Sequence, residues 1–403
     1  MQRRHLLQHA LSLPLAVSSL SLRAAPSAPA RLLVVFLRGA YDCASLLVPI
    51  TSSDYAAMRP SIAIGPPGSG DNKAALPLTA DWGLAPVLRD SMLPLWQRGQ
   101  LAFVPFAGTD DLSRSHFETQ DSIELGLPLQ GPRSFDSGFM NRLAGVLDAH
   151  DAIAFTDQLP LVFRGPASVP NLALNGAGRG GLDAGQAARI AAMYQGSPLA
   201  GPVDEGFAVR RDAARELGGT QSGGMQGEMA AASRNAITAK GFEGEARRIA
   251  RLMRERYRLG FVDVGGWDTH VGQGGASGVL ANRLGELGQG LAAFGEEIGP
   301  AWDQTVVVVI SEFGRTFREN GNRGTDHGHG TVYWLLGGAV RGGRIVGEQV
   351  PVNAANLFQN RDYPVLNEYR AVLGGLFVRL YGLSPAQLQR VFPGAAPRDL
   401  GLV

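Results

Sequence analysis

Short runs of consecutive apolar residues recur along this chain, and each run ends abruptly in polar residues. The clearest are Leu32–Leu37, Val306–Ile310 and Phe261–Val264, the last interrupted by one aspartate. A run of this length, rich in β-branched residues, is typical of a strand that a parallel sheet buries on both faces. Leu101–Pro105 and Thr331–Gly338 indicate further strands. The pattern therefore predicts a central sheet built from these segments.

Apolar residues at three- and four-residue steps indicate amphipathic helices between the strands. The longest such stretch runs from Val279 to Ile298, between two predicted strands, and completes a β-α-β unit that we expect to be right-handed. Helices are also predicted from Phe117 to about Leu125 and from Tyr369 to Tyr381. Strands that alternate with helices predict an α/β fold with a doubly wound, mostly parallel sheet and helices on both faces.

The segment between about residues 182 and 257 differs from its surroundings. It is less apolar, rich in arginine and alanine, and broken by a glycine-rich stretch at 218–224. We interpret it as a helical insertion with a mobile loop that covers a cleft and selects the substrate. The rest of residues 31–403 is predicted to form a single domain, because 403 residues that are 45% apolar can bury one large core.

Residues 1–30 have the layout of an export signal. Arg3 and Arg4 precede a modestly apolar stretch, and small residues and prolines follow it at 24–30. The paired arginines favour the twin-arginine route, and the general secretory route is the alternative. The apolar stretch is short and interrupted by polar residues, so no stable membrane anchor is expected after signal removal. We predict a periplasmic or secreted protein.

The net charge limits the classes of partner, and the cysteine content limits how the fold can be stabilised. The formal net charge is +1, which argues against a surface for nucleic acid or another polyanion. Cys43 is the single cysteine, so no internal disulfide can form. The core and any bound metal must therefore stabilise the fold.

Acidic and histidine side chains gather directly after the predicted strands. The carboxyl ends of parallel strands meet at one edge of a sheet, where α/β proteins bind their ligands. Carboxylates combined with imidazoles suit zinc or manganese, and calcium or magnesium if carboxylates dominate. The candidate metal ligands are Asp42, Asp268, His270, Glu312, Asp326, His327 and His329.

Several of these polar positions have two interpretations. Asp42, taken alone, fits a helix cap or turn as well as a ligand, and His116 alone fits a hydrogen bond at a helix start. Arg315 follows Glu312 by three positions and is either a structural ion-pair partner or a bidentate clamp for an oxyanion. Ser113 and Ser115 are either helix N-caps or a nucleophile at a positive helix N-terminus.

Five motifs lie in order across almost the whole chain. They are L-R-G-A-Y-D at 37–42, S-R-S-H-F-E-T-Q-D at 113–121, G-G-W-D-T-H at 265–270, S-E-F-G-R-T at 311–316 and D-H at 326–327. Together they resemble the bacterial family known as domain of unknown function 1501, whose members are often exported. Membership of that family implies no established reaction.

That family is in turn similar to the alkaline phosphatase and sulfatase superfamily, whose doubly wound sheet carries two divalent metal ions at its carboxyl edge. The similarity implies that Ser113 or Ser115 is the nucleophile. Two ions would polarise the ester oxygens and lower the pKa of that nucleophile. The metal ligands implied by the similarity are Asp42, Asp268, His270, Asp326, His327 and His329.

Two features depart from the superfamily pattern. Phe313 stands where the superfamily commonly has a histidine, so one imidazole ligand is missing and the number of ions, one or two, stays open. Cys43 does not begin the Cys-x-Pro-x-Arg motif that sulfatases convert to formylglycine. A conventional formylglycine sulfatase is therefore not expected.

We predict an exported, metal-dependent hydrolase of phosphate or sulfate esters, acting on a small-molecule or polymer ester. The alternative is a non-catalytic, metal-binding exported protein that acts in envelope assembly or as the partner of another exported protein. Phe313 favours the alternative, whereas the Asp-x-His and Asp-His-x-His segments favour the enzyme. The candidate catalytic residues are Ser113, Ser115, His116 and Arg315.

Overall fold

The computed structural model of this chain describes residues 30–68, 71–130, 133–174, 192–197, 200–201, 233–234 and 236–403. The predicted export signal, apart from residue 30, and most of the predicted insertion lie outside the described residues. Within the described ranges, every helix is too short or too polar to span a bilayer.

A central sheet with strand order β11-β5-β10-β9-β1-β8-β6 organises the fold, with β12 paired to β5 and β7 paired to β8. The apolar runs at 32–37, 101–105, 261–264 and 306–310 lie in its strands, as predicted, and the run at 331–338 forms a strand that ends two residues earlier, at Leu336. The strands are β1 (Arg31–Leu37), β5 (Leu101–Gly108), β6 (Ala152–Ala154), β7 (Ile237–Thr238), β8 (Leu259–Gly265), β9 (Thr305–Ser311), β10 (Thr331–Leu336), β11 (Arg344–Ile345) and β12 (Asn367–Glu368).

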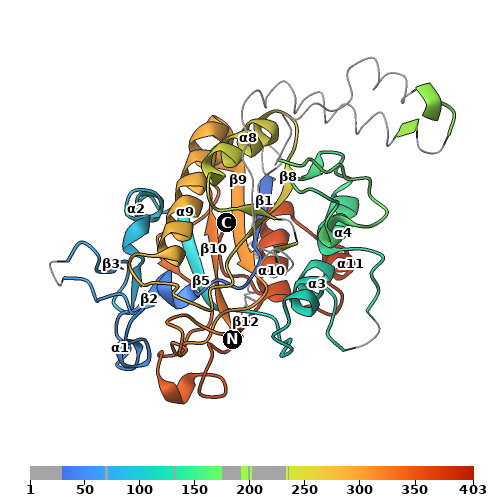
Figure 1. The fold of residues 1–403 in the computed structure, drawn as a ribbon. Helices are drawn as coiled ribbons and strands as arrows, with labels where there is room; N and C mark the ends of the chain where they lie inside the picture. Colours follow the sequence, from blue (N-terminus) through green and yellow to red (C-terminus); the bar gives the residue numbers. More distant parts are fainter. Residues whose placement is uncertain are drawn as a thin grey trace, which may run out of the picture.

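Successive residues of the central strands enter two different cores, which explains why these strands are apolar without interruption. In β1, Leu33 and Val35 join one core, whereas Val34 and Phe36 join the other. Figure 1 shows helices on both sides of the sheet, so the doubly wound α/β fold is confirmed. Helices α2 (Met92–Gln97), α8 (Phe242–Glu255) and α9 (Val279–Ile298) pack into the first core, and α3 (His116–Leu125), α4 (Phe139–Leu147), α10 (Tyr369–Tyr381) and α11 (Pro385–Val391) into the second.

Helix α8 is the described helix at the end of the predicted insertion. It lies within residues 182–257, yet Phe242, Ile249 and Met253 are buried in the core beside α9. This part of the predicted insertion therefore contributes apolar side chains to the first core. The smaller elements are α1 (Tyr55–Met58), the sheet of β2 (Leu47–Pro49), β4 (Trp82–Leu84) and β3 (Leu76–Pro77), and the 3-10 helices Cys43–Ser45, Pro86–Leu88, Leu161–Phe163, Gly299–Gln304 and Ala354–Asn356.

Strand β10 runs against its neighbours. It pairs antiparallel with both β9 and β5, whereas β1 pairs parallel with β8 and β9. The beginning of β10 therefore lies at the edge where β1, β8, β9 and β5 end. This geometry brings the segments after four strands, and the segment before a fifth, to one edge of the sheet.

Candidate metal centre

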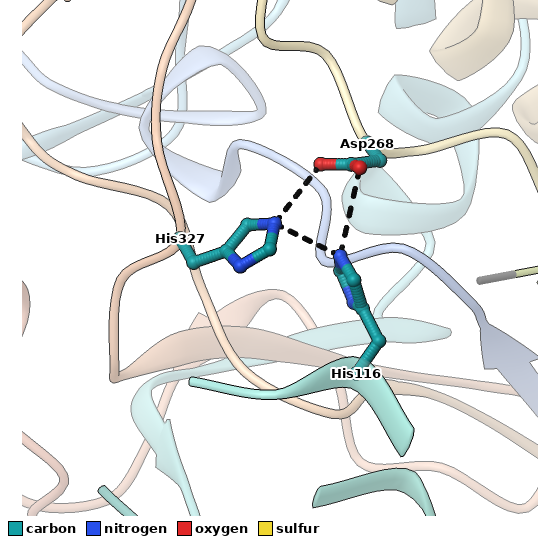
Figure 2. Close-up of side chains that lie close together, drawn as sticks. All are labelled: His116, Asp268 and His327. Atoms are coloured by element: carbon teal, nitrogen blue, oxygen red, sulfur yellow. Dashed lines mark hydrogen bonds and ion pairs between the residues drawn. The ribbon is translucent and has the colours of Figure 1, made fainter. Parts of the chain in front are cut away.

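Among the described residues, one group of His and Asp side chains is compact enough to surround an ion: His116, Asp268 and His327. His116 begins α3, which follows β5; Asp268 follows β8; and His327 precedes β10. Figure 2 shows the three side chains pointing toward one another. The two Nε2 atoms lie 3.0 Å apart, and they lie 3.6 Å and 3.3 Å from the oxygens of Asp268.

The hydrogen bonds behind each imidazole define its tautomer. Nδ1 of His116 donates to the Glu312 carboxylate over 2.8 Å, and Nδ1 of His327 donates to the Arg114 carbonyl oxygen over 3.0 Å. Both partners are acceptors only, so in a neutral ring the proton is on Nδ1 and Nε2 carries a lone pair. With both rings neutral, two lone pairs and a carboxylate therefore face one another, and either a proton on one Nε2 or a metal ion between them stabilises this arrangement.

His270 borders this group, and each of its ring nitrogens faces a carboxylate. Its Nδ1 lies 3.2 Å from Asp326, so both Asp326 and Asp268 can accept a proton from this ring. Its Nε2 lies 3.1 Å from Nε2 of His327 and 2.9 Å from Asp268. Asn320 donates to the same Asp326 oxygen and to the His270 carbonyl oxygen, and so fixes this pair.

The donor set and its spacing fit a zinc-sized ion. Ligand atoms at roughly 2.0–2.2 Å from a tetrahedral zinc lie about 3.3–3.6 Å from each other. The separations within the group, 3.0, 3.3 and 3.6 Å, are centred near this range. Imidazoles whose second nitrogen donates to a carboxylate or carbonyl are also the usual ligands of protein-bound zinc.

Electrostatics favour a positive charge at this point. Burial opposes the charged form of His116, but its hydrogen bonds to Asp268 and Glu312 outweigh burial and raise its pKa to about 9. Burial likewise opposes ionisation of Asp268, yet contacts with His116, His327 and Arg315 hold its pKa well below the usual range. The pKa of buried Glu312 is also lowered, chiefly by the hydrogen bond from His116.

Glu312 and Arg315 position ligands instead of joining the group. Glu312 is completely buried, and besides His116 it accepts hydrogen bonds from the Gly39 amide over 2.7 Å and from Gln120 over 3.0 Å. Arg315 donates to Asp268 and to Thr325, and its side chain has no exposed surface. Arg315 forms an ion pair with Asp268, whereas its position in the sequence suggested Glu312 as the partner.

Asp42, expected as a metal ligand, has its carboxylate surrounded by hydrogen-bond donors. Arg59 forms a fully buried ion pair with it, and Ser45 and Gln273 donate over 2.8 and 2.6 Å. Asp42 also caps the short helix that begins at Cys43, as its alternative interpretation anticipated. A guanidinium group therefore neutralises Asp42 just after the end of β1, where the sequence predicted a metal ligand.

Two further expected ligands lie outside the group. His329 is buried against Phe358, with ring centroids 4.9 Å apart, and burial lowers its pKa to about 4. Asp326 contacts His270 and is half exposed. Phe313 packs instead on the centre itself, with its ring 5.0 Å from that of His116 and 5.3 Å from that of His327.

The two candidate serines differ in how their hydroxyl groups are used. The Ser113 hydroxyl accepts from the Ser115 amide over 3.3 Å and lies 3.3 Å from the Thr119 hydroxyl. Ser115 occupies the N-cap position of α3, but its side chain makes no capping hydrogen bond. Ser115 directly precedes His116 in the chain, and its hydroxyl is not used in capping.

Backbone hydrogen bonds join the loops that carry Asp268 and His327. Thr325 donates to the Thr269 carbonyl, and the amides of Gly272 and Gln273 donate to the carbonyls of residues 322 and 323. Arg315 and His327 pair as an antiparallel bridge. At Gly328 a Cβ atom would lie only 2.5 Å from the Arg315 backbone, so no larger residue fits there.

Sequence reasoning did not identify three residues that this arrangement uses. Arg59 neutralises Asp42, Gln120 supports Glu312, and Asn320 supports both His270 and Asp326. Only Gln120 carried a usable signal, because it lies four residues after His116 on the same helix face. Arg59 and Asn320 lie in irregular segments, where spacing does not predict contacts.

Replacing Glu312 with glutamine is expected to weaken zinc binding by about 10- to 100-fold, because His116 loses the carboxylate that fixes its tautomer and orientation. Competition with a chromophoric chelator measures this affinity. Glu348→Gln, at an exposed carboxylate, is the matched control and should bind zinc like the unaltered protein. Equal affinities in the two variants would contradict the positioning role of Glu312.

Comparison with known proteins identifies a family and several distant structures. The family model described as "Protein of unknown function (DUF1501)" matches residues 29–392. No curated protein matches the chain at a significant level.

Three of the similar solved structures show how low the sequence identity and the structural similarity are. A protein in the alkaline phosphatase superfamily from Vibrio parahaemolyticus is 12% identical, with a TM-score of 0.34 over 81% of this chain and 62% of that one. The lipoteichoic acid synthase LtaP from Listeria monocytogenes is 9% identical, with a TM-score of 0.39 over 92% and 75%. The PsFucS1 sulfatase from Pseudoalteromonas sp. is 11% identical, with a TM-score of 0.37 over 79% and 64%. This chain thus spans less than two thirds of the length of the first and third.

Proposed function

The chain belongs to the family described as protein of unknown function (DUF1501), and we propose its function from the site itself, because that description names no reaction. The proposed function is that of an exported, metal-dependent hydrolase of phosphate or sulfate esters. The observation that carries the proposal is the convergence of two imidazole lone pairs and a carboxylate at the carboxyl edge of the sheet. Three protein ligands and an open position are typical of catalytic zinc sites.

The proposed occupant is one zinc ion per chain, held by His116, Asp268 and His327, with His270 beside it. The preference for zinc over calcium or magnesium rests on the two imidazole ligands, since the latter ions favour oxygen. The limit of one ion rests on Asp42, whose carboxylate already neutralises Arg59.

Ser115 is the proposed nucleophile. A bound divalent ion would polarise an ester oxygen and favour loss of the proton from a nearby hydroxyl. The Ser115 oxygen would form a bond to phosphorus or sulfur, the bond to the leaving alcohol would break, and the alcohol would take up a proton. Water would then release phosphate or sulfate from Ser115. The amino end of α3 favours the negative charge of such a group.

Ser115→Ala is expected to lower turnover by at least about a hundredfold while zinc content stays unchanged, because the variant loses the attacking oxygen but no ligand. Steady-state kinetics and elemental analysis measure the two quantities. Ser113→Ala is the matched control, and we expect it to keep most of the activity. Full activity in Ser115→Ala would exclude this serine as the nucleophile.

The test of the function itself combines elemental analysis with an ester panel. Purified protein would be assayed on phosphate monoesters, phosphate diesters and sulfate esters, before and after chelation and again after zinc is restored. We expect stoichiometric zinc and a hydrolysis that chelation abolishes and zinc restores. Stoichiometric zinc without hydrolysis of any ester would contradict the enzyme.

The second candidate is a metal-binding exported protein without turnover that acts with another exported protein. The packing of Phe313 on both ligand imidazoles favours it, because an apolar ring shields one side of the centre. Stable zinc together with inactivity on the whole panel would support this candidate. Export itself is testable by following a full-length fusion in cells with and without a functional twin-arginine system.

A further inference from the structure

A separate cavity of about 360 Å³ lies at the other end of α3 from His116. Its size is near the lower limit for small-molecule pockets, roughly 300–1,000 Å³. Glu124, on α3, lines the cavity, and eight residues of helix rise place it about 12 Å from His116 along the axis. The cavity is thus distinct from the metal centre but shares a helix with it.

The charged residues of the cavity largely cancel one another. Among the described residues, its carboxylates are Asp121, Glu124, Asp157 and Asp263. These four groups would repel a strongly anionic ligand, and the guanidinium groups that pair with them would repel a cation. The charges therefore favour a ligand without net charge.

Three guanidinium groups accompany the carboxylates: Arg38, Arg164 and Arg234. Arg38 is 2% exposed and donates to Asp263 over 2.6 Å and to Glu124 over 2.9 Å. Arg234 donates to Asp121 over 2.6 Å. Guanidinium and carboxylate groups held in these pairs offer both donors and acceptors at fixed positions, which suits hydroxyl groups.

The remaining wall of the cavity is apolar. Phe135 has half of its surface exposed, and Leu159, Pro160 and Leu161 also line the space. A ligand ring with one apolar face and a polar edge can stack on this aromatic side chain and form hydrogen bonds with the paired polar groups. Sugar residues have this character.

We propose that this cavity binds a sugar residue, or a similar uncharged and hydroxyl-rich ring. In the setting of the proposed function, on which this last step rests, the sugar is part of the organic portion of the ester. A chain of hydrogen bonds from Arg38 through Gln120 to Glu312, which holds His116, links the cavity to the centre. The substrate class is thus a phosphate or sulfate ester of a saccharide that extends over the length of α3.

Calorimetric titration of the full protein with maltose, cellobiose, lactose and diacetylchitobiose tests the proposal. We expect at least one of these disaccharides to bind, and Phe135→Ala to weaken that binding by about tenfold or more through loss of the ring contact. Val279→Ala, at an exposed apolar residue outside the cavity lining, is the control and should bind normally. Asp157→Asn provides a second variant that changes the cavity without removing apolar surface.

Three results would overturn the proposal. The first is that no disaccharide binds at millimolar concentration, and the second is that disaccharide binding is unaltered in both Phe135→Ala and Asp157→Asn. The third is that the cavity binds inorganic phosphate or sulfate, shown by loss of that binding in either variant. Repeating the titration with His327→Ala separates this proposal from the hydrolase. Disaccharide binding that survives in this variant would show that the cavity binds its ligand independently of the metal centre. Disaccharide binding by unaltered, zinc-loaded protein that hydrolyses no ester of the panel would retain the cavity and reject the reaction.

Discussion

Protein in which His327 is replaced with alanine is expected to purify without zinc and to hydrolyse esters at least about a thousandfold more slowly. The reason is that His327 contacts both other members of the group, so its removal leaves only one imidazole and one carboxylate. A metal that stabilises transition-state charge by several kcal/mol accounts for a loss of this size, since each 1.36 kcal/mol is a factor of ten. Elemental analysis and initial rates measure the two effects.

Two further variants complete this experiment. Asp268→Ala should reproduce both losses, because Asp268 is the anionic member of the group. His150→Ala removes an imidazole that is 92% exposed and is expected to change neither zinc content nor rate. Zinc retained at full stoichiometry in both His327→Ala and Asp268→Ala would show that the zinc ion binds elsewhere.

Replacement of Asp42 with alanine should have the opposite profile: a large loss of stability with zinc content unchanged in the folded protein. Arg59 is fully buried and would lose the carboxylate that neutralises it. Breaking a buried ion pair by removing one partner costs about 3–5 kcal/mol of the free energy of unfolding. Denaturant unfolding measures this cost, and elemental analysis measures the zinc.

Asp90→Ala, at an exposed aspartate, is the matched control for Asp42→Ala and should unfold like the unaltered protein. A double variant that also replaces Arg59 with leucine should regain part of the lost stability, because the orphaned charge is then removed. If Asp42→Ala instead lost zinc and stayed stable, Asp42 would be a ligand after all.

Much of the fold could be predicted because buried strands and amphipathic helices leave strong patterns. The helix at Val279–Ile298 begins and ends where its apolar spacing indicated, and the run at Val306–Ile310 is the centre of β9. The direction of β10 could not be predicted, because an apolar run is the same whichever way a strand points. That direction matters, since it brings His327 to the edge where the other strands end.

The sequence predicted which residue types form the candidate site, but it did not predict the role of each residue. Glu312, Asp326 and Asp268 are all acids near strand ends, yet in the structure only Asp268 faces the two Nε2 atoms of His116 and His327. Glu312 and Asp326 instead accept from Nδ1 of imidazoles. Which atom of a ring a carboxylate meets depends on backbone positions from distant segments, and spacing along the chain does not encode these.

The backbone hydrogen bonds between the loops at 269–273 and 322–325 have a consequence for how an ion is captured. They hold Asp268, His270 and His327 in register as one preorganised half of the centre. His116 arrives on a separate element, the first turn of α3. Folding, rather than binding of the proposed ion, therefore bears most of the entropic cost of ordering the ligands.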